Sequence, residues 1–303
     1  MKYSLLISFS LLLFISYQEN SPTTPQKNQL NETSEQHQPE EHPRDSLKTS
    51  IAEELFPTTL NWNKLEIELS EKERLNLIHA AKVSMQTTLD QTILEDSSLN
   101  HSYHILHLNE DALPDVIYHG WSGGEPLITI ATLNQGDHFN QWFSVMQTPL
   151  NLEFEDNRLH KITMNNPGCC ANPVITVTEY LVSDTLTPIK RFAYLDFIDL
   201  EGTDMTPVKF TVTQEHYNLR CTPALDDTSE YYFGVMDFGN IIGELHRGNR
   251  GIAYKSATDS TGRVWWLIAT DPMETANSPY GSDDSEIPVQ YIGWISSRYV
   301  ETD

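Results

Sequence analysis

The chain has 303 residues, about twice the length of a typical domain, so two folded domains are the first expectation. Acidic residues outnumber basic residues 43 to 19, and the formal charge of −24 repels phosphate backbones and anionic lipid, which excludes nucleic acid as a partner. Thirteen Tyr, eleven Phe and six Trp can build a core, so a wholly disordered chain is excluded, and three Cys are too few for a disulfide scaffold.

Residues 1–18 have the pattern of a secretory signal peptide. Lys2 supplies the positive start, and residues 5–15 form an apolar run shorter than the ~20 residues that a membrane span requires. The segment resembles a bacterial lipoprotein signal in which Tyr17 replaces the Cys that accepts the lipid. We therefore expect an exported protein, periplasmic or associated with the cell envelope, that is not lipidated and is not stably inserted in the membrane after signal cleavage.

Residues 19–51 are predicted to be a disordered linker. They are rich in Gln, Asn, Glu, Ser, Thr and Pro and almost lack aromatic residues. Such a segment cannot bury enough apolar area to offset the entropy lost on ordering. We expect it to hold the folded part of the chain away from a surface.

Residues 52–214 are predicted to form a β-rich domain of unknown function with one long helix. Ser70 and Glu73 have the spacing of a capping box, which predicts a helix over residues 70–89. Its apolar stripe, expected to pack on a sheet, is Leu75, Ile78, Lys82, Met85 and Leu89. After residue 100 the apolar period changes to two, which predicts strands at 103–108, 115–119, 127–133, 139–146, 150–154, 159–164, 174–182, 191–197 and 208–212.

The turn after the first predicted strand is similar to the calcium loop of FG-GAP and related repeats. Asn109, Asp111 and Asp115 match the third, fifth and ninth positions of that loop, while His107 and Ala112 replace its first acid and its Gly. The resemblance implies a calcium ion held by these oxygen atoms. The alternative is a turn whose Asn and Asp side chains bond their own backbone.

The three cysteines allow two interpretations. Cys169 and Cys170 lie in a loop between Pro and Gly residues, and an oxidising compartment favours a disulfide between them, or between Cys221 and either one. The pairing stays open. Alternatively, Cys170 is the nucleophile of a hydrolase, with His119 or His160 as the candidate base.

The C-terminal segment, residues 215–303, is similar to bacterial SH3 (SH3b) domains. Four segments carry the resemblance in the family order, at residues 219–223, 240–248, 264–268 and 293–300, the last reading Gly-Trp-Ile-Ser-Ser-Arg-Tyr-Val. The resemblance implies a small β-barrel. The predicted fold class is therefore α+β, mainly β: a β-rich domain with one long helix, followed by an SH3-like barrel.

An aromatic groove is the predicted ligand site of this barrel. Adjacent Trp265 and Trp266 must point to opposite faces of their strand, so one of them is expected at the surface. Beside Tyr254, Trp294 or Tyr299 it would form a groove for sugars or peptides. The alternative is that both indoles are packed in the core.

These patterns predict an exported, non-catalytic binding protein whose SH3-like module recognises cell-wall peptide or glycan, or an envelope protein. Two alternatives stay open: a hydrolase that uses Cys170 or a calcium-supported site around Asp111 and Asp115, and a purely structural envelope protein. No cofactor is expected apart from calcium.

Overall fold

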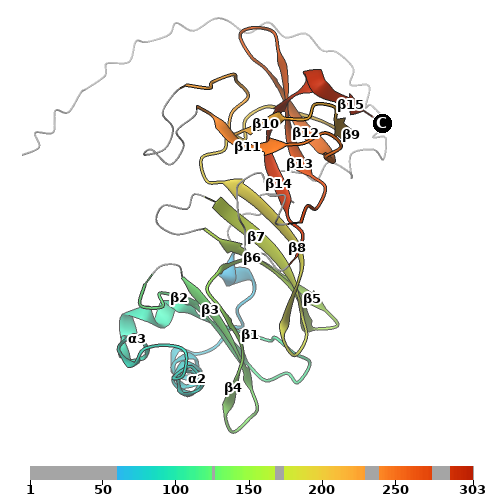
Figure 1. Cartoon of the computed structure of the whole chain (residues 1–303). Helices are drawn as coiled ribbons and strands as arrows, with labels where there is room; N and C mark the ends of the chain where they lie inside the picture. The colour runs from blue at the N-terminus through green and yellow to red at the C-terminus, as the bar shows by residue number, and fades with distance from the viewer. Residues whose placement is uncertain (1–59, 125–126, 168–173, 229–238, 275–286, 303) are drawn as a thin grey trace, which may run out of the picture. The chain divides into compact units, whose positions relative to one another are not determined.

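The computed structural model describes residues 60–124, 127–167, 174–228, 239–274 and 287–302 (Figure 1). The predicted signal peptide, the predicted linker, Cys169 and Cys170 lie outside these residues. The described part consists mainly of strands with a few helices, which confirms the predicted α+β, mainly β class. None of its helices has the length and apolar character that crossing a membrane requires.

The one long helix, α2 (Glu71–Ser84), begins where the sequence predicts. The Ser70 hydroxyl oxygen accepts a hydrogen bond from the Glu73 amide at 3.4 Å, and the Glu73 carboxylate accepts one from the Ser70 amide at 3.0 Å. This completes the capping box. The helix ends at Ser84, before the predicted limit at residue 89, and Leu89 is buried in the turn beyond it.

The buried face of α2 differs from the predicted stripe, because Lys82 is only half-buried and Ala81 was not predicted. Leu75 is 40% exposed, whereas Ile78, Ala81 and Met85 are buried. These three side chains pack against the first sheet, in a cluster with Tyr103, Ile105, Val116, Tyr118 and Ile130. The predicted packing of the helix on a sheet is therefore confirmed. The shorter helices of the described residues are η2 (Trp62–Lys64), α3 (Gln91–Glu95), η3 (Ser97–Ser102) and η6 (Ser297–Tyr299).

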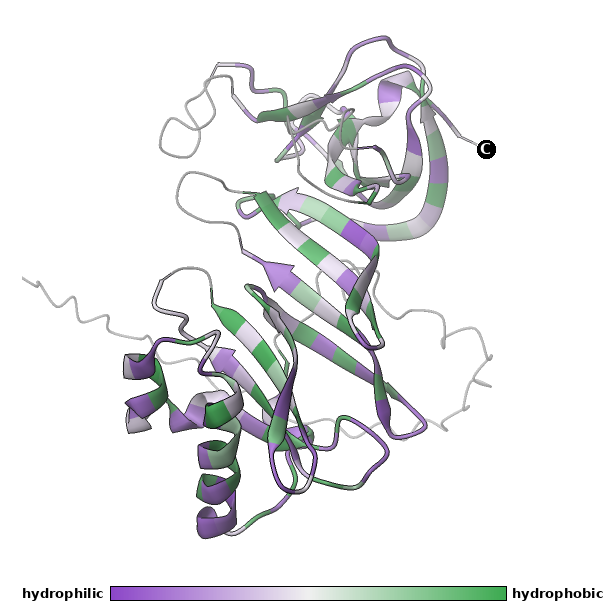
Figure 2. Ribbon diagram, turned by 60° about the horizontal axis from the view of Figure 1, so that its bottom comes forward, coloured by the Kyte–Doolittle hydropathy of each residue, from purple (hydrophilic) through white to green (hydrophobic). Residues whose placement is uncertain are grey.

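The first sheet is a four-stranded antiparallel meander with the order β1-β2-β3-β4. Its strands lie within a few residues of the predicted bounds: β1 (Tyr103–Leu106), β2 (Asp115–Gly120), β3 (Ile128–Asn134) and β4 (Phe139–Val145). Bands of apolar and polar residues alternate along many of the strands, as Figure 2 shows. This sheet is nonetheless buried on both faces, because α2 covers one face and apolar side chains from the segment between Leu152 and Val182 pack on the other.

The second sheet has eleven strands, nine of which follow one path in the order β15-β9-β12-β13-β14-β8-β7-β6-β5. Its first part is the predicted hairpin of β5 (Thr148–Glu155) and β6 (Arg158–Asn166), in which Asp156 and Asn157 have positive φ angles. Its other strands are β7 (Val174–Val182), β8 (Leu186–Leu195), β9 (Thr203–Val212), β10 (Tyr217–Arg220), β11 (Ile241–Leu245), β12 (Arg250–Thr258), β13 (Val264–Thr270), β14 (Gln290–Ser296) and β15 (Val300–Thr302).

The C-terminal strands do not close into the small barrel that the family resemblance implies. β14 pairs in parallel with β8, through Tyr291 and Ala193, and it also pairs with β10 at Trp294. Because the pairing of β14 with β8 joins the C-terminal strands to the preceding ones, the described strands form one open sheet and not a closed barrel. β9 pairs with both β12 and β15, so a strand upstream of the predicted boundary at residue 215 belongs to the C-terminal sheet.

Candidate functional site

The five predicted ligand-binding aromatic residues lie on two faces of the C-terminal strands. As expected from strand alternation, Trp265 and Trp266 of β13 point to opposite sides. Trp265 shares one apolar cluster with Trp294 and Tyr254, whereas Trp266 packs against another cluster. The structure therefore does not bring the five rings into one groove.

Trp265 and Trp294 are core residues. They are 1% and 0% exposed, and each indole N–H has an internal acceptor: Asp259 Oδ2 at 2.9 Å from Trp265, and the Asp199 carbonyl oxygen at 2.6 Å from Trp294. Hydrogen bonds from the Thr261 hydroxyl and the Trp265 indole hold the pKa of Asp259 well below its usual range. Neither ring presents a face to solvent, so the prediction that these two bind a ligand is corrected.

Tyr299 is the predicted aromatic residue that remains at the surface. The residue is 45% exposed and lies in η6 (Ser297–Tyr299), directly before β15. The Tyr299 carbonyl oxygen accepts hydrogen bonds from the amide and the hydroxyl of Thr213, both at 3.0 Å. The ring packs edge-on against Tyr217, with centroids 5.9 Å apart and an interplanar angle of 88°. An exposed ring is thus attached to a fixed backbone.

Tyr217 links this exposed ring to the core. Its hydroxyl donates a hydrogen bond to the Ser296 carbonyl oxygen, and its side chain is 9% exposed. Trp266, half-buried, packs against the same cluster that contains Tyr217. We call the place where exposed Tyr299 packs on Tyr217, beside the cluster that Trp266 also contacts, the Tyr299 edge.

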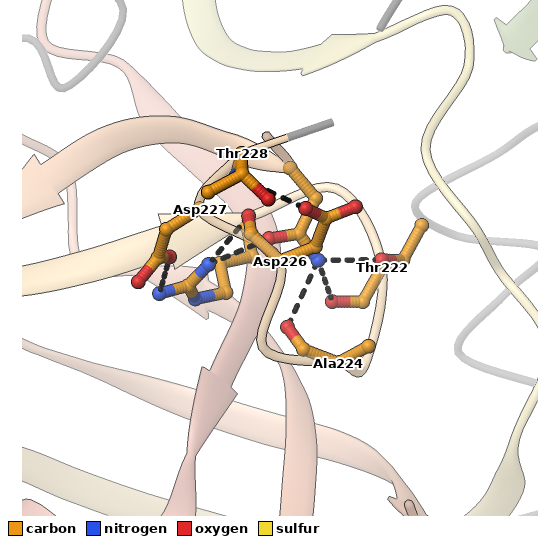
Figure 3. Close-up of polar contacts among 7 residues, drawn as sticks. Thr222, Ala224, Asp226, Asp227 and Thr228 are labelled. Atoms are coloured by element: carbon orange, nitrogen blue, oxygen red, sulfur yellow. Dashed lines mark hydrogen bonds and ion pairs between the residues drawn. The ribbon is translucent and has the colours of Figure 1, made fainter. Parts of the chain in front are cut away.

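A buried polar network lies at the loop end of the β10–β11 hairpin, where Arg220 ends β10 and Asn240 precedes β11. Arg220 is 4% exposed, and its guanidinium donates to Asn240 Oδ1 at 2.6 Å and pairs with Asp227 at 2.7 Å. The Asn240 amide nitrogen donates to both oxygens of Thr222 and to the Ala224 carbonyl (Figure 3). The network joins the described residues 222–227 to Asn240, directly before β11.

The open end of this hairpin carries a cluster that the sequence analysis missed. His216, Glu244 and His246 each offer a ligand atom, and these atoms lie within 4.8 Å of one another. The hydrogen bond to Glu244 raises the pKa of His216. A signal was present in the sequence, because Glu244 lies in β11 and His246 follows the end of that strand, two residues on, but the approach of His216 depends on strand pairing.

The loop that resembles a calcium site uses its polar atoms internally. Asn109 Oδ1 accepts a hydrogen bond from the Asp111 amide at 3.1 Å, and Asp111 Oδ1 accepts one from the Leu113 amide at 2.8 Å. Ala112, in the place of the Gly, has a φ angle of +59°. These contacts are those of the alternative interpretation, a turn whose side chains bond the backbone.

Asp115 connects this loop to the first sheet. It is fully buried, and its two carboxylate oxygens accept hydrogen bonds from the amides of Leu108 and Asn134, each at 2.8 Å. Burial raises the pKa of Asp115 to about 6, although the two hydrogen bonds act in the opposite direction. Calcium binding by Asn109, Asp111 and Asp115 stays a prediction, and it would have to displace these backbone contacts.

Among the cysteines, the structure describes only Cys221, which is a free and buried thiol. Burial raises its pKa to about 11. Its pairing with Cys169 or Cys170 therefore finds no support, while a bond between those two stays a prediction outside the described residues. Of the candidate bases for Cys170, His119 is half-buried with its pKa lowered by burial to about 4, and His160 lies 3.4 Å from Glu155.

Protein-family models, curated proteins and solved structures were compared with this chain, and none of the three comparisons found a match.

Proposed function

We propose that this protein is an exported, non-catalytic binding protein that attaches to the peptide or glycan of the cell wall through the Tyr299 edge. The observation that carries the proposal is that Tyr299 is 45% exposed on a backbone held by two hydrogen bonds from Thr213. The sequence resemblance to SH3b domains points to the same class of ligand.

The fixed position of Tyr299 favours binding for an energetic reason. Ordering a mobile side chain and its backbone on binding costs free energy, and a ring that is already held avoids part of that cost. The packed Tyr217 ring behind it limits the rotation of Tyr299. An amphipathic phenol of this kind offers an apolar face to a sugar ring or a peptide and a hydroxyl to a polar group.

The charge of the chain narrows the choice of partner. With a formal charge of −24, the protein repels anionic polymers and attracts amino groups. The neutral glycan and the amine-bearing peptides of a cell wall fit this field better than acidic wall polymers do.

The test is retention of the full chain on insoluble, purified peptidoglycan. The wild-type protein is expected to sediment with it, and Tyr299→Ala is expected to weaken retention roughly 5- to 30-fold, the range for an aromatic residue at the centre of a binding surface. Phe154→Ala is the matched control, because Phe154 is 39% exposed on β5, away from the Tyr299 edge. It is expected to bind as the wild type does.

Equal retention of the wild type and Tyr299→Ala, or no retention of either, would contradict the proposal. In the second case, crosslinking of the wild type to an envelope protein would favour a protein partner, and the absence of any ligand would favour a purely structural role.

A further inference from the structure

The β10–β11 hairpin brings three side chains of metal-ligand type to one face. Tyr217 pairs with Leu245, and both side chains are buried in the core. Successive side chains of a strand point to opposite faces. His216, which precedes Tyr217, and Glu244 and His246, which flank Leu245, therefore lie together on the outer face.

The distances within this group are close to those of a metal site. The Nδ1 atom of His216 lies 2.8 Å from Glu244 Oε1, and the Nδ1 atom of His246 lies 3.7 Å from the same oxygen. In a tetrahedral zinc site with bonds of about 2.0–2.2 Å, neighbouring ligand atoms are about 3.4 Å apart. The two observed separations bracket this value, so small side-chain rotations would complete the site.

The surroundings support the same chemistry. The side chains of His216, Glu244 and His246 are 70%, 43% and 52% exposed, so an ion can enter from solvent and a water molecule can complete its coordination. The two imidazole rings are nearly perpendicular, with centroids 5.8 Å apart, and do not block each other. The strongly acidic chain also concentrates cations near its surface.

We propose that His216, Glu244 and His246 form a binding site for a divalent transition metal ion, with zinc as the favoured ion. Two imidazoles and one carboxylate are a ligand set that zinc accepts in proteins, with a fourth position left for water. The proposal goes beyond the proposed function, since it needs no cell-wall ligand.

One existing contact competes with the metal. The Nδ1 atom of His246 also lies 3.0 Å from the Glu215 carbonyl oxygen, which is the geometry of an N–H donating to that oxygen. An ion bound at this nitrogen replaces that hydrogen bond. The site is therefore expected to bind zinc less tightly than a preformed four-ligand structural site does.

The experiment is a calorimetric titration of the metal-free full chain with zinc chloride. The variants His216→Gln, Glu244→Gln and His246→Gln each remove one ligand. Because the loss of a residue that only orients a ligand costs roughly 10- to 100-fold in affinity, the loss of a ligand is expected to weaken this site by about 100-fold or more. The wild type should thus bind one zinc ion per chain that all three variants lose.

His160→Gln is the matched control. His160 lies 3.4 Å from Glu155 in an exposed pair. Among the described residues, this pair is not part of a group of three side chains that could hold a metal ion. Its zinc binding should equal that of the wild type. Circular dichroism checks that all variants are folded. The proposal is overturned if His246→Gln binds zinc as the wild type does, or if His160→Gln loses as much binding.

Zinc binding is measured without cell-wall material, and retention on peptidoglycan is measured in the presence of a chelator. The two results can therefore fail independently, and failure of the metal site leaves the proposed function of the Tyr299 edge untouched.

Discussion

Two regions of the molecule concentrate polar side chains at the end of a strand, and they use them differently. In the loop of residues 109–115, Asn109, Asp111 and Asp115 bond to backbone amides of their own region. At the open end of the β10–β11 hairpin, His216, Glu244 and His246 face solvent and contact one another, and among the described residues the one backbone oxygen that contacts their ring nitrogens is the Glu215 carbonyl, 3.0 Å from His246 Nδ1. Residue type alone therefore does not identify a ligand site. The exposure of the side chains, and the number of their oxygen and nitrogen atoms that already bond to backbone groups, also matter.

The largest expected effect concerns the buried polar network at the loop end of the β10–β11 hairpin. Asn240→Ala removes one hydrogen-bond acceptor of buried Arg220, which keeps its ion pair with Asp227, and the hydrogen bonds that the Asn240 side chain donates to Thr222 and Ala224. Leaving the acceptors of Thr222 and Ala224 and one Arg220 donor without their partner is expected to lower the free energy of unfolding by about 3 kcal/mol. Urea denaturation measures the loss.

Asn151→Ala, at an exposed position of β5, is the control and should change stability by less than about 0.5 kcal/mol. A similar stability for Asn240→Ala and the wild type would show that the network does not hold the hairpin.

The next largest effect concerns Asp115 and pH. Its pKa is about 6 in the folded protein and is raised from 3.8. The folded state therefore holds the proton more tightly than the unfolded chain between about pH 4 and pH 6, and the free energy of unfolding falls as pH rises through this window. At about 1.4 kcal/mol for each unit, the decrease is about 3 kcal/mol.

Asp115→Asn should lose this component of the pH dependence, whereas Asp184→Asn, at an exposed position, should keep it. The measurement is urea denaturation of the three proteins at pH 4 and pH 7. Parallel pH profiles for the wild type and Asp115→Asn would refute the assignment.

The smallest effect concerns the turn of the loop. Ala112 has a φ angle of +59°, a left-handed conformation that costs about 1 kcal/mol for a residue with a Cβ atom. Ala112→Gly relieves this strain but increases the entropy of the unfolded chain, so a net stabilisation of about 0.5 kcal/mol is expected. Ala80→Gly, on the exposed side of α2, should instead destabilise the protein by about 1 kcal/mol. Melting temperatures that shift in the same direction would contradict this account.

Local features of the fold could be predicted from the sequence. The capping box at Ser70, strand β7 (Val174–Val182) and the hairpin turn at residues 156–157 depend on residues close together in the chain. The strand alternation also predicted that Trp265 and Trp266 point to opposite faces. These features are determined by short-range sterics and periodicity.

Features that depend on pairing between distant strands could not be predicted. The burial of Trp294 depends on packing with Trp265. The pairing of β14 with β8 joins segments about a hundred residues apart, and the periodicity of a sequence does not show which distant strands pair. The approach of His216 to His246 likewise follows from the register of β10 and β11. Of the five aromatic residues predicted to bind a ligand, Trp265 and Trp294 are buried and Tyr299 is exposed, and ligand binding by Tyr299 stays a prediction.

The central claim is that the Tyr299 edge, and not the helix-backed first sheet, meets the ligand. Hydrogen–deuterium exchange of the full chain, with and without soluble peptidoglycan fragments, tests it most directly. The account predicts slower exchange on binding in residues 213–217 and 297–302, with no change in residues 103–145. Slower exchange confined to residues 103–145, or no change anywhere at saturating fragment concentration, would contradict it.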